Sequence, residues 1–161
     1  APLFFHANSA GSALAGRIRK TLEWWQRYLE NPPKRVIQGT STPRERVILY
    51  SDATGDGRVA WVMASARLNC FSSSSAWVSE SIRNSVCFRK VQIGTWELIA
   101  AVAALHSLFR MPAFEAGPLE IHLFIDSKSA LHTLLRGTSR QPDWNFFVQE
   151  IWFITATQSH L

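Results

Sequence analysis

The sequence predicts an α/β fold in which helices flank a mixed β-sheet, with a helical extension at the N-terminus. Short apolar runs bounded by turn residues alternate with longer stretches of helical periodicity. The segments come in the order of two hairpin strands, a helix, a strand and two further helices. This order is typical of a mixed sheet with helices packed on it, and two of the expected strands end in an aspartate.

The first domain, residues 1–33, is expected to be an arm followed by a helix. Residues 1–11 carry little periodic signal, whereas apolar residues recur every three or four positions after Ser12, a suitable N-cap. Pro32 and Pro33 end the helix because they lack the amide hydrogen that a helix needs. The apolar face consists of Leu14, Ile18, Leu22, Trp25 and Leu29. Basic residues on the other faces fit either a solvated surface or contacts with phosphates.

A polar linker is expected over residues 34–45, followed by the second domain over residues 46–161. The linker contains Gly39, Pro43 and several hydroxyl side chains, which are typical of irregular connections. The sequence therefore places the domain boundary in this stretch.

The first strand of the second domain is predicted at about residues 46–51. Its apolar run Val47–Tyr50 shows no alternation, which indicates a strand buried on both faces of the sheet, and Asp52 ends it. Residues Thr54–Gly57 have the composition of a turn, so Val59–Met63 is expected to return as the second strand of a hairpin.

The sequence does not decide which segment forms the third strand. The four serines 72–75 are expected to form a loop. Either Ala76–Val78 or Val86–Phe88 would then supply the strand.

A long helix is predicted over residues 96–110, with Thr95 as its N-cap and Pro112 beyond its end. The next strand is predicted over residues 119–125. It ends in a second strand-terminal acid, Asp126.

Two helices are expected to complete the chain. Ser127 caps the first, over residues 128–136, and Gly137 is suited to a left-handed C-cap. Pro142 and Asp143 begin the second, which is expected to fray after residue 154. Its predicted apolar face consists of Trp144, Phe147, Val148, Ile151 and Trp152.

The composition narrows the class of protein. Hydrophobic residues make up 47% of the 161 residues, which is ample for a folded core and argues against wholesale disorder. No apolar run approaches the roughly 20 residues that span a bilayer, so no membrane span is expected. The formal charge of +5 favours polyanionic partners mildly, although a solvated basic surface explains it as well. The sequence does not indicate in which cellular compartment the protein resides.

Three acids form the candidate site. Asp52 and Asp126 end strands, and ligands of open α/β sheets gather at the carboxyl ends of strands. Glu97, near the start of a helix, reaches the same end if that helix crosses the sheet. Carboxylates this close repel one another, and a divalent cation resolves the repulsion. Each acid also has a structural alternative, as a turn or helix cap or as a charge favoured by the helix dipole.

The segments Tyr50–Thr54, Trp96–Ala101 and Ile125–Leu131 resemble the three successive acidic motifs of the ribonuclease H fold. The pattern is similar to the ribonuclease H domain of retroelement (retrotransposon) reverse transcriptases, particularly the DIRS-like type. The helix around Leu22–Trp25 resembles the segment just upstream of that domain. The resemblance covers residues 12–157, nearly all of the chain.

This resemblance implies a five-stranded mixed sheet and a hydrolase that cleaves the RNA strand of RNA–DNA hybrids. Asp52, Glu97 and Asp126 would be the catalytic and metal-binding residues, for two Mg²⁺ ions or for Mn²⁺. Ser127, Lys128 and Arg136 would contact the nucleic-acid backbone. For Lys128 and Arg136, a solvated helix face is an equal alternative.

The chain departs from the family pattern at its end. The family continues with a fifth strand, a loop containing a histidine and a helix bearing a fourth acid, whereas this sequence ends at Leu161. Asp143 lies on the wrong element to be that acid. We therefore expect a domain that is incomplete at its C-terminus, with an open sheet edge that a protein partner can cover. The alternative function is a catalytically inactive domain that serves as a structural or binding subunit of a larger assembly.

Overall fold

The computed structural model describes residues 44–85, 93–114 and 119–158, together with eight helical residues nearer the N-terminus. The chain divides into two compact units, Ala1–Lys34 and Arg35–Leu161. The eight helical residues are Arg19, Leu22, Glu23, Trp25, Gln26, Arg27, Leu29 and Glu30.

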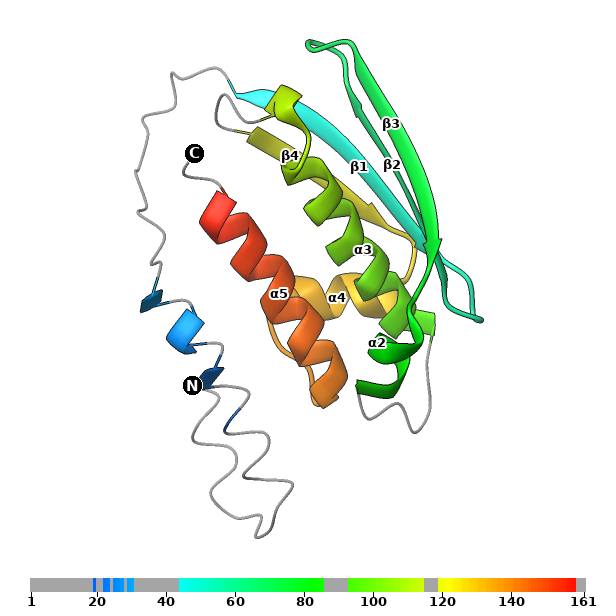
Figure 1. Ribbon diagram of the computed structural model, residues 1–161, viewed down its shortest axis with the longest axis vertical. Coiled ribbons are helices and arrows are strands. Elements are labelled where there is room, and N and C mark those ends of the chain that lie inside the picture. Colours follow the sequence, from blue (N-terminus) through cyan, green and yellow to red (C-terminus); the bar gives the residue numbers. More distant parts are fainter. Residues whose placement is uncertain are drawn as a thin grey trace, which may run out of the picture. The chain divides into compact units, whose positions relative to one another are not determined.

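The second unit contains four described strands and four described α-helices (Figure 1). The strands are β1 (Glu45–Ala53), β2 (Arg58–Ser65), β3 (Cys70–Trp77) and β4 (Leu119–Ile125). The helices are α2 (Glu80–Ser85), α3 (Ile93–Phe109), α4 (Lys128–Arg136) and α5 (Pro142–Gln158), with a short 3₁₀ helix at Pro112–Phe114.

The sheet is mixed and has the strand order β3-β2-β1-β4. β1 pairs antiparallel with β2 and parallel with β4, and β2 pairs antiparallel with β3. The predicted α/β class is therefore confirmed, as are the hairpin and the turn at Thr54–Gly57. In that turn the amide of Gly57 donates to the carbonyl of Thr54 (3.0 Å), with Gly57 at a φ of 90°.

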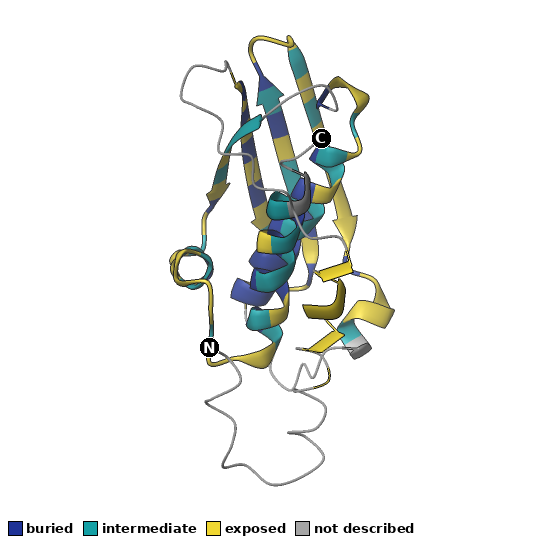
Figure 2. Ribbon diagram, turned by 90° about the vertical axis from the view of Figure 1, so that its left-hand side faces the viewer, coloured by how far each residue is buried: buried dark blue, intermediate teal, exposed yellow. Residues whose placement is uncertain are grey.

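The prediction that β1 is buried on both faces is wrong. Its residues alternate, so that Val47 and Leu49 are fully buried while Ile48 and Tyr50 are 37% and 52% exposed. α3 packs on β1 and β2 and covers only one face of the sheet (Figures 1 and 2). The other face stays open among the described residues, and the ring of Phe124 on β4 stacks on Tyr50 there, at a centroid distance of 4.7 Å.

The third strand, β3, includes Ala76 and Trp77 of one alternative drawn from the sequence, but it begins much earlier, at Cys70. β3 contains serines 72–75, which were expected to form a loop, and it ends at Trp77. The backbone ladder with β2 holds these serines in an edge strand, where most of their side chains meet water and burial makes no demand for apolar residues. The other candidate strand, Val86–Phe88, lies outside the described residues.

α3 begins at Ile93, earlier than predicted. Thr95 is therefore a residue of the helix and not its N-cap. The buried Thr95 hydroxyl instead accepts a hydrogen bond from the indole of Trp144 on α5 (2.9 Å). α3 packs against the sheet and against α5, which explains why it is apolar around most of its circumference. The buried residues concentrate on α3 and on alternate residues of the strands (Figure 2).

The last two helices follow the sequence closely, with two exceptions, both on α5. Ser127 caps α4, and Gly137 ends it at a φ of 73°, both as predicted. Of the apolar residues predicted to share the inner face of α5, Trp152 is 52% exposed and lies outside the core. The helix continues to Gln158 and does not fray after residue 154.

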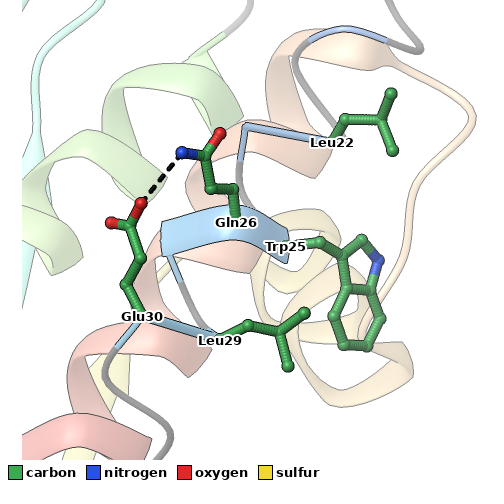
Figure 3. A pocket seen from close by; sticks show the side chains of 5 residues that line it. All are labelled: Leu22, Trp25, Gln26, Leu29 and Glu30. Atoms are coloured by element: carbon green, nitrogen blue, oxygen red, sulfur yellow. Dashed lines mark hydrogen bonds between the residues drawn. The ribbon is translucent and has the colours of Figure 1, made fainter.

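In the first unit, the described residues are helical and expose their apolar side chains. Leu22, Trp25 and Leu29 are 54%, 40% and 65% exposed, and they line a shallow surface with Gln26 and Glu30 (Figure 3). The amide of Gln26 donates to the Glu30 carboxylate at 2.9 Å.

The predicted arm, the N-cap Ser12, the apolar positions Leu14 and Ile18, and most of the linker lie outside the described residues. None of the described helices is long and apolar enough to cross a membrane.

Gly94→Ala should destabilise the second unit by on the order of 1–2 kcal/mol. A Cβ at Gly94 would lie 2.5 Å from the ring of Trp144, which is buried and held by its hydrogen bond to Thr95. Urea denaturation measures the effect. Gly55→Ala is the matched control, because a Cβ at Gly55 meets no atom within 4 Å. Equal stability of the two variants would contradict this packing of α5 on α3.

Candidate metal centre at the carboxyl ends of β1 and β4

Parallel pairing of β1 with β4 places Asp52 and Asp126 side by side. The register of the two strands ends with the pair Ser51–Ile125, and each aspartate is the next residue. Neighbouring strands lie about 4.8 Å apart, so the two backbones are close at this point. Both aspartates are exposed, and the Asp52 carboxylate accepts a hydrogen bond from the amide of Ala53 (2.8 Å).

Ser51 ties the two strands together just before the aspartates. Its side chain is buried, and its hydroxyl donates to the carbonyl of Phe124 across the strands at 3.5 Å. The sequence analysis assigned it no role. Its only signal is a small polar residue between an apolar run and an acid.

Glu97 approaches the aspartates from α3. The helix begins at Ile93, so Glu97 lies beyond its first turn, and its side chain is only 3% exposed. One carboxylate oxygen, Oε2, is buried and has no hydrogen-bond partner among the described residues. A buried polar atom without a partner is costly, which makes this oxygen the one unexplained feature of the site.

The electrostatics of the site link Glu97 to both aspartates. The pKa of Glu97 is raised from 4.5 to about 7, chiefly by burial and then by the negative charges of Asp52 and Asp126. A hydrogen bond from the backbone of Ala53 opposes the rise. The three acids that the sequence singled out therefore lie near enough for the two aspartates to act on the ionisation of Glu97.

The chemistry of the donors fits a divalent cation, because Mg²⁺ and Mn²⁺ prefer carboxylate oxygens. Among the described residues, however, no three His, Cys, Asp or Glu side chains are gathered closely enough to hold an ion. Glu97 is fixed by burial, whereas Asp52 and Asp126 are exposed and can change rotamer. Closure on an ion therefore requires the two aspartates to turn toward Glu97.

The three residues expected to bind substrate are arranged along α4. The hydroxyl of Ser127 accepts from the amide of Ala130 (3.3 Å), so its role in the described structure is that of an N-cap. Lys128 is exposed and follows directly, two residues after Asp126. Arg136 is also exposed, but it ends the helix, about 12 Å further along its axis. Lys128 is thus beside the candidate site and Arg136 is not.

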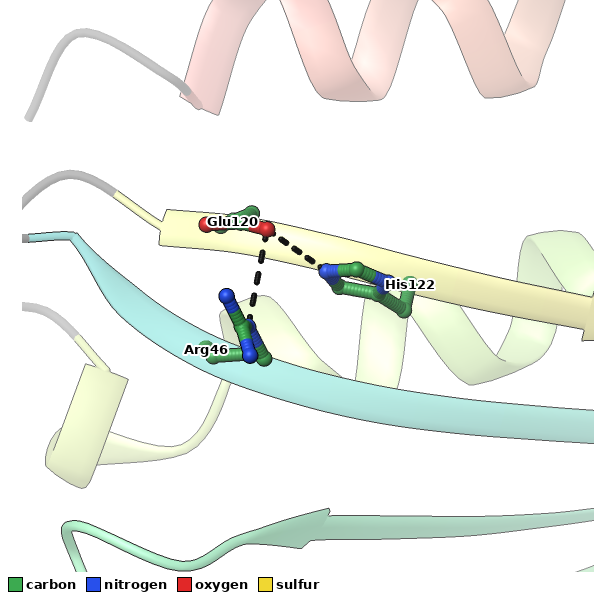
Figure 4. A network of polar contacts seen from close by, with 3 residues as sticks. All are labelled: Arg46, Glu120 and His122. Atoms are coloured by element: carbon green, nitrogen blue, oxygen red, sulfur yellow. Dashed lines mark hydrogen bonds and ion pairs between the residues drawn. The ribbon is translucent and has the colours of Figure 1, made fainter. Parts of the chain in front are cut away.

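A second polar cluster lies at the other end of the same two strands (Figure 4). Arg46 and Glu120 are register partners and form an ion pair at 3.5 Å, and the ring of His122 contacts the same carboxylate at 2.7 Å. The hydrogen bond from His122, and then the charge of Arg46, lower the pKa of Glu120. In this cluster, the carboxylate of Glu120 is paired with both Arg46 and His122.

The sequence matches no protein-family model and no curated protein.

The raised pKa of Glu97 predicts a specific dependence of stability on pH. The folded protein keeps the Glu97 proton up to about pH 7, whereas the unfolded chain releases it near 4.5. In EDTA, the free energy of unfolding should therefore fall as the pH rises through this window. Glu97→Gln should abolish the fall, so that its stability equals that of the wild type near pH 5 and exceeds it by on the order of 1–3 kcal/mol at pH 8.

Urea denaturation at both pH values measures this difference. Glu120→Gln is the control, because the pKa of Glu120 is lowered and its removal should give no gain at pH 8. Parallel pH profiles of the wild type and Glu97→Gln would mean that Glu97 is not held in a repulsive, desolvated site.

Proposed function

We propose that this chain is a ribonuclease H-like domain of a retroelement reverse transcriptase, of the DIRS-like type. Its activity is the divalent-metal-dependent hydrolysis of the RNA strand of RNA–DNA hybrids. The observation that carries the proposal is the buried, partnerless oxygen of Glu97 beside two further carboxylates. A protein gains no stability from such a group, so a ligand is the natural reason to retain it.

A divalent cation accounts for all three carboxylates together. Asp52, Glu97 and Asp126 would hold Mg²⁺, or Mn²⁺ in its place, and the positive charge would remove the repulsion between them. In the family that the sequence resembles, two ions occupy this position. When bound, such ions activate a water for attack on the scissile phosphate and stabilise the charge that develops on the leaving oxygen.

The surroundings of the site would fix the position of the carboxylates, limit the access of water and attract the substrate. The core beneath Glu97 keeps its carboxylate fixed and partly dry, which strengthens its attraction to a cation. Asp52 and Asp126 supply the exposed side on which a phosphate can approach. Lys128 stands next to Asp126 with a charge of the sign that attracts a nucleic-acid backbone.

The fold and the charge are compatible with this function. The hairpin, the helix carrying the second acid and the parallel strand carrying the third follow one another in the order of the family's motifs. The formal charge of +5 favours a polyanionic substrate. Recognition of a hybrid would depend on backbone shape and 2′-hydroxyl groups, for which no base-reading element is needed.

A second candidate function is an inactive domain that serves as a subunit of a larger assembly. It is favoured by the loose spacing of the carboxylates among the described residues and by the exposed apolar side chains on the open face of the sheet. The two functions differ in one measurable property, which is metal-dependent cleavage.

We predict that the purified chain cleaves the RNA strand of a labelled RNA–DNA hybrid in Mg²⁺ or Mn²⁺ and not in EDTA. Asp52→Asn should lower the rate by on the order of 100-fold or more, because it removes a metal ligand. Its stability in EDTA should equal or slightly exceed that of the wild type, since a repelling charge is lost. Gel analysis of the labelled strands measures the rate.

Asp143→Asn is the matched control, because it makes the same change in the first turn of α5 and should leave the rate unchanged. A DNA duplex of the same sequence should remain intact. Cleavage that survives in Asp52→Asn would rule out the proposed metal site, and a folded chain that cuts nothing would support the second candidate function.

A further inference from the structure

Two side chains from other elements, Arg83 of α2 and Trp96 of α3, donate hydrogen bonds to the backbone of the turn between β1 and β2. The guanidinium of Arg83 donates to the carbonyl of Asp56 through Nη2 (2.8 Å) and to the carbonyl of Val78 through Nε (3.1 Å). The indole of Trp96 donates to the carbonyl of Gly55 at 3.2 Å. The sequence indicated no role for Arg83, and it indicated Trp96 only as part of the motif around Glu97.

The two side chains also contact each other and leave space only for glycine at position 57. The guanidinium of Arg83 lies over the ring of Trp96, 5.6 Å from its centroid. A Cβ at Gly57 would lie 2.8 Å from Nη2 of Arg83 and 3.4 Å from the Trp96 ring. The carbonyl of Gly57 accepts from the amide of Val78 at 3.0 Å, so the turn is fixed to the chain after β3 as well.

The hairpin does not need Arg83 to close. The amide of Thr54 donates to the carbonyl of Arg58 at 2.8 Å, and the Thr54 hydroxyl donates to the carboxylate of Asp56. These bonds lie within the turn itself. What Arg83 and Trp96 add is a connection between the turn and the helices α2 and α3.

This connection joins the two elements that carry the candidate ligands. Asp52 lies near the end of β1, three residues before Gly55, and Trp96 directly precedes Glu97 on α3. When Glu97 is ionised and no cation is present, its carboxylate and that of Asp52 repel each other across these two elements. A fixed connection beside the site opposes their separation.

We propose that Arg83 is a positioning residue, which holds the β1–β2 turn against the first turn of α3 and so keeps the backbones that carry Asp52 and Glu97 close enough for both side chains to turn onto one divalent cation. The inference rests on the metal site of the proposed function. Arginine suits this role because its planar group donates to two carbonyls at once while stacking on an aromatic ring. A lysine at this position offers one compact charge and no planar stack.

The test is the affinity of the full chain for Mg²⁺, measured by isothermal titration calorimetry at a temperature at which every variant is folded. Arg83→Ala should weaken Mg²⁺ binding by on the order of 10-fold, within the range found when a residue that orients metal ligands is removed. Arg83→Lys should bind with intermediate affinity. Arg58→Ala is the matched control, since Arg58 belongs to the same hairpin but its guanidinium donates to the hydroxyl of Ser75 (3.3 Å) and to no carbonyl of the turn among the hydrogen bonds of the described residues.

Trp96→Phe provides an independent test, because it keeps an aromatic ring at this position and removes the hydrogen bond to the carbonyl of Gly55. It should weaken Mg²⁺ binding in the same direction, and it decides the question if Arg83→Ala does not fold. Thermal unfolding in EDTA separates a purely structural role. A lower melting temperature of Arg83→Ala with unchanged Mg²⁺ affinity would overturn the inference.

The outcomes distinguish this inference from the proposed function. If the wild type binds Mg²⁺ and the Arg83 and Trp96 variants bind it equally well, the positioning role is wrong and the metal site stands. If the wild type binds no Mg²⁺ or Mn²⁺, both are wrong. Equal weakening by Arg83→Ala and Arg58→Ala would assign the effect to the lost charge and would likewise overturn the positioning role.

Discussion

The parallel pairing of β1 with β4 is the constraint on which the candidate site depends. It aligns the carboxyl ends of two strands that are far apart in the sequence and makes Asp52 and Asp126 neighbours. α3 then brings Glu97 to the same end, because the helix lies on β1 and β2. An antiparallel pairing of β1 with β4 would have put the two aspartates at opposite ends of the strands. The topology, more than any single contact, concentrates negative charge at one point.

That concentration opposes folding, and the rest of the second unit compensates for it. α3 is buried between the sheet and α5, so its position is set by apolar packing and does not respond to the charge at its start. The hydrogen bond between Trp144 and Thr95 fixes the same end of the helix. Glu97 is thus held in an unfavourable environment by residues that have no part in the chemistry, as is common where strain is stored at a functional site.

Features set by local sequence could be predicted, and those set by tertiary contacts could not. The caps Ser127 and Gly137 depend on residues within one helical turn, and the sequence indicated both. Thr95 has the same chemistry as an N-cap, but its partner is Trp144, which is distant in the chain. The acids were found because strand ends are visible in a hydrophobic pattern. Arg83 was not found, because its partners are backbone carbonyls, which leave no trace in the choice of residue.

The serines of β3 have a consequence for the edge of the sheet. Where both faces of a strand are equally polar, a shift by one residue exposes or buries nothing new, so hydrophobicity does not define the alignment. The alignment of β3 is defined at its two ends instead. At one end Asn69 closes the turn after β2 with a φ of 46°, and at the other Val78 bonds to Gly57. The register of β3 is therefore fixed by backbone contacts at its two ends, and not by the burial of its side chains.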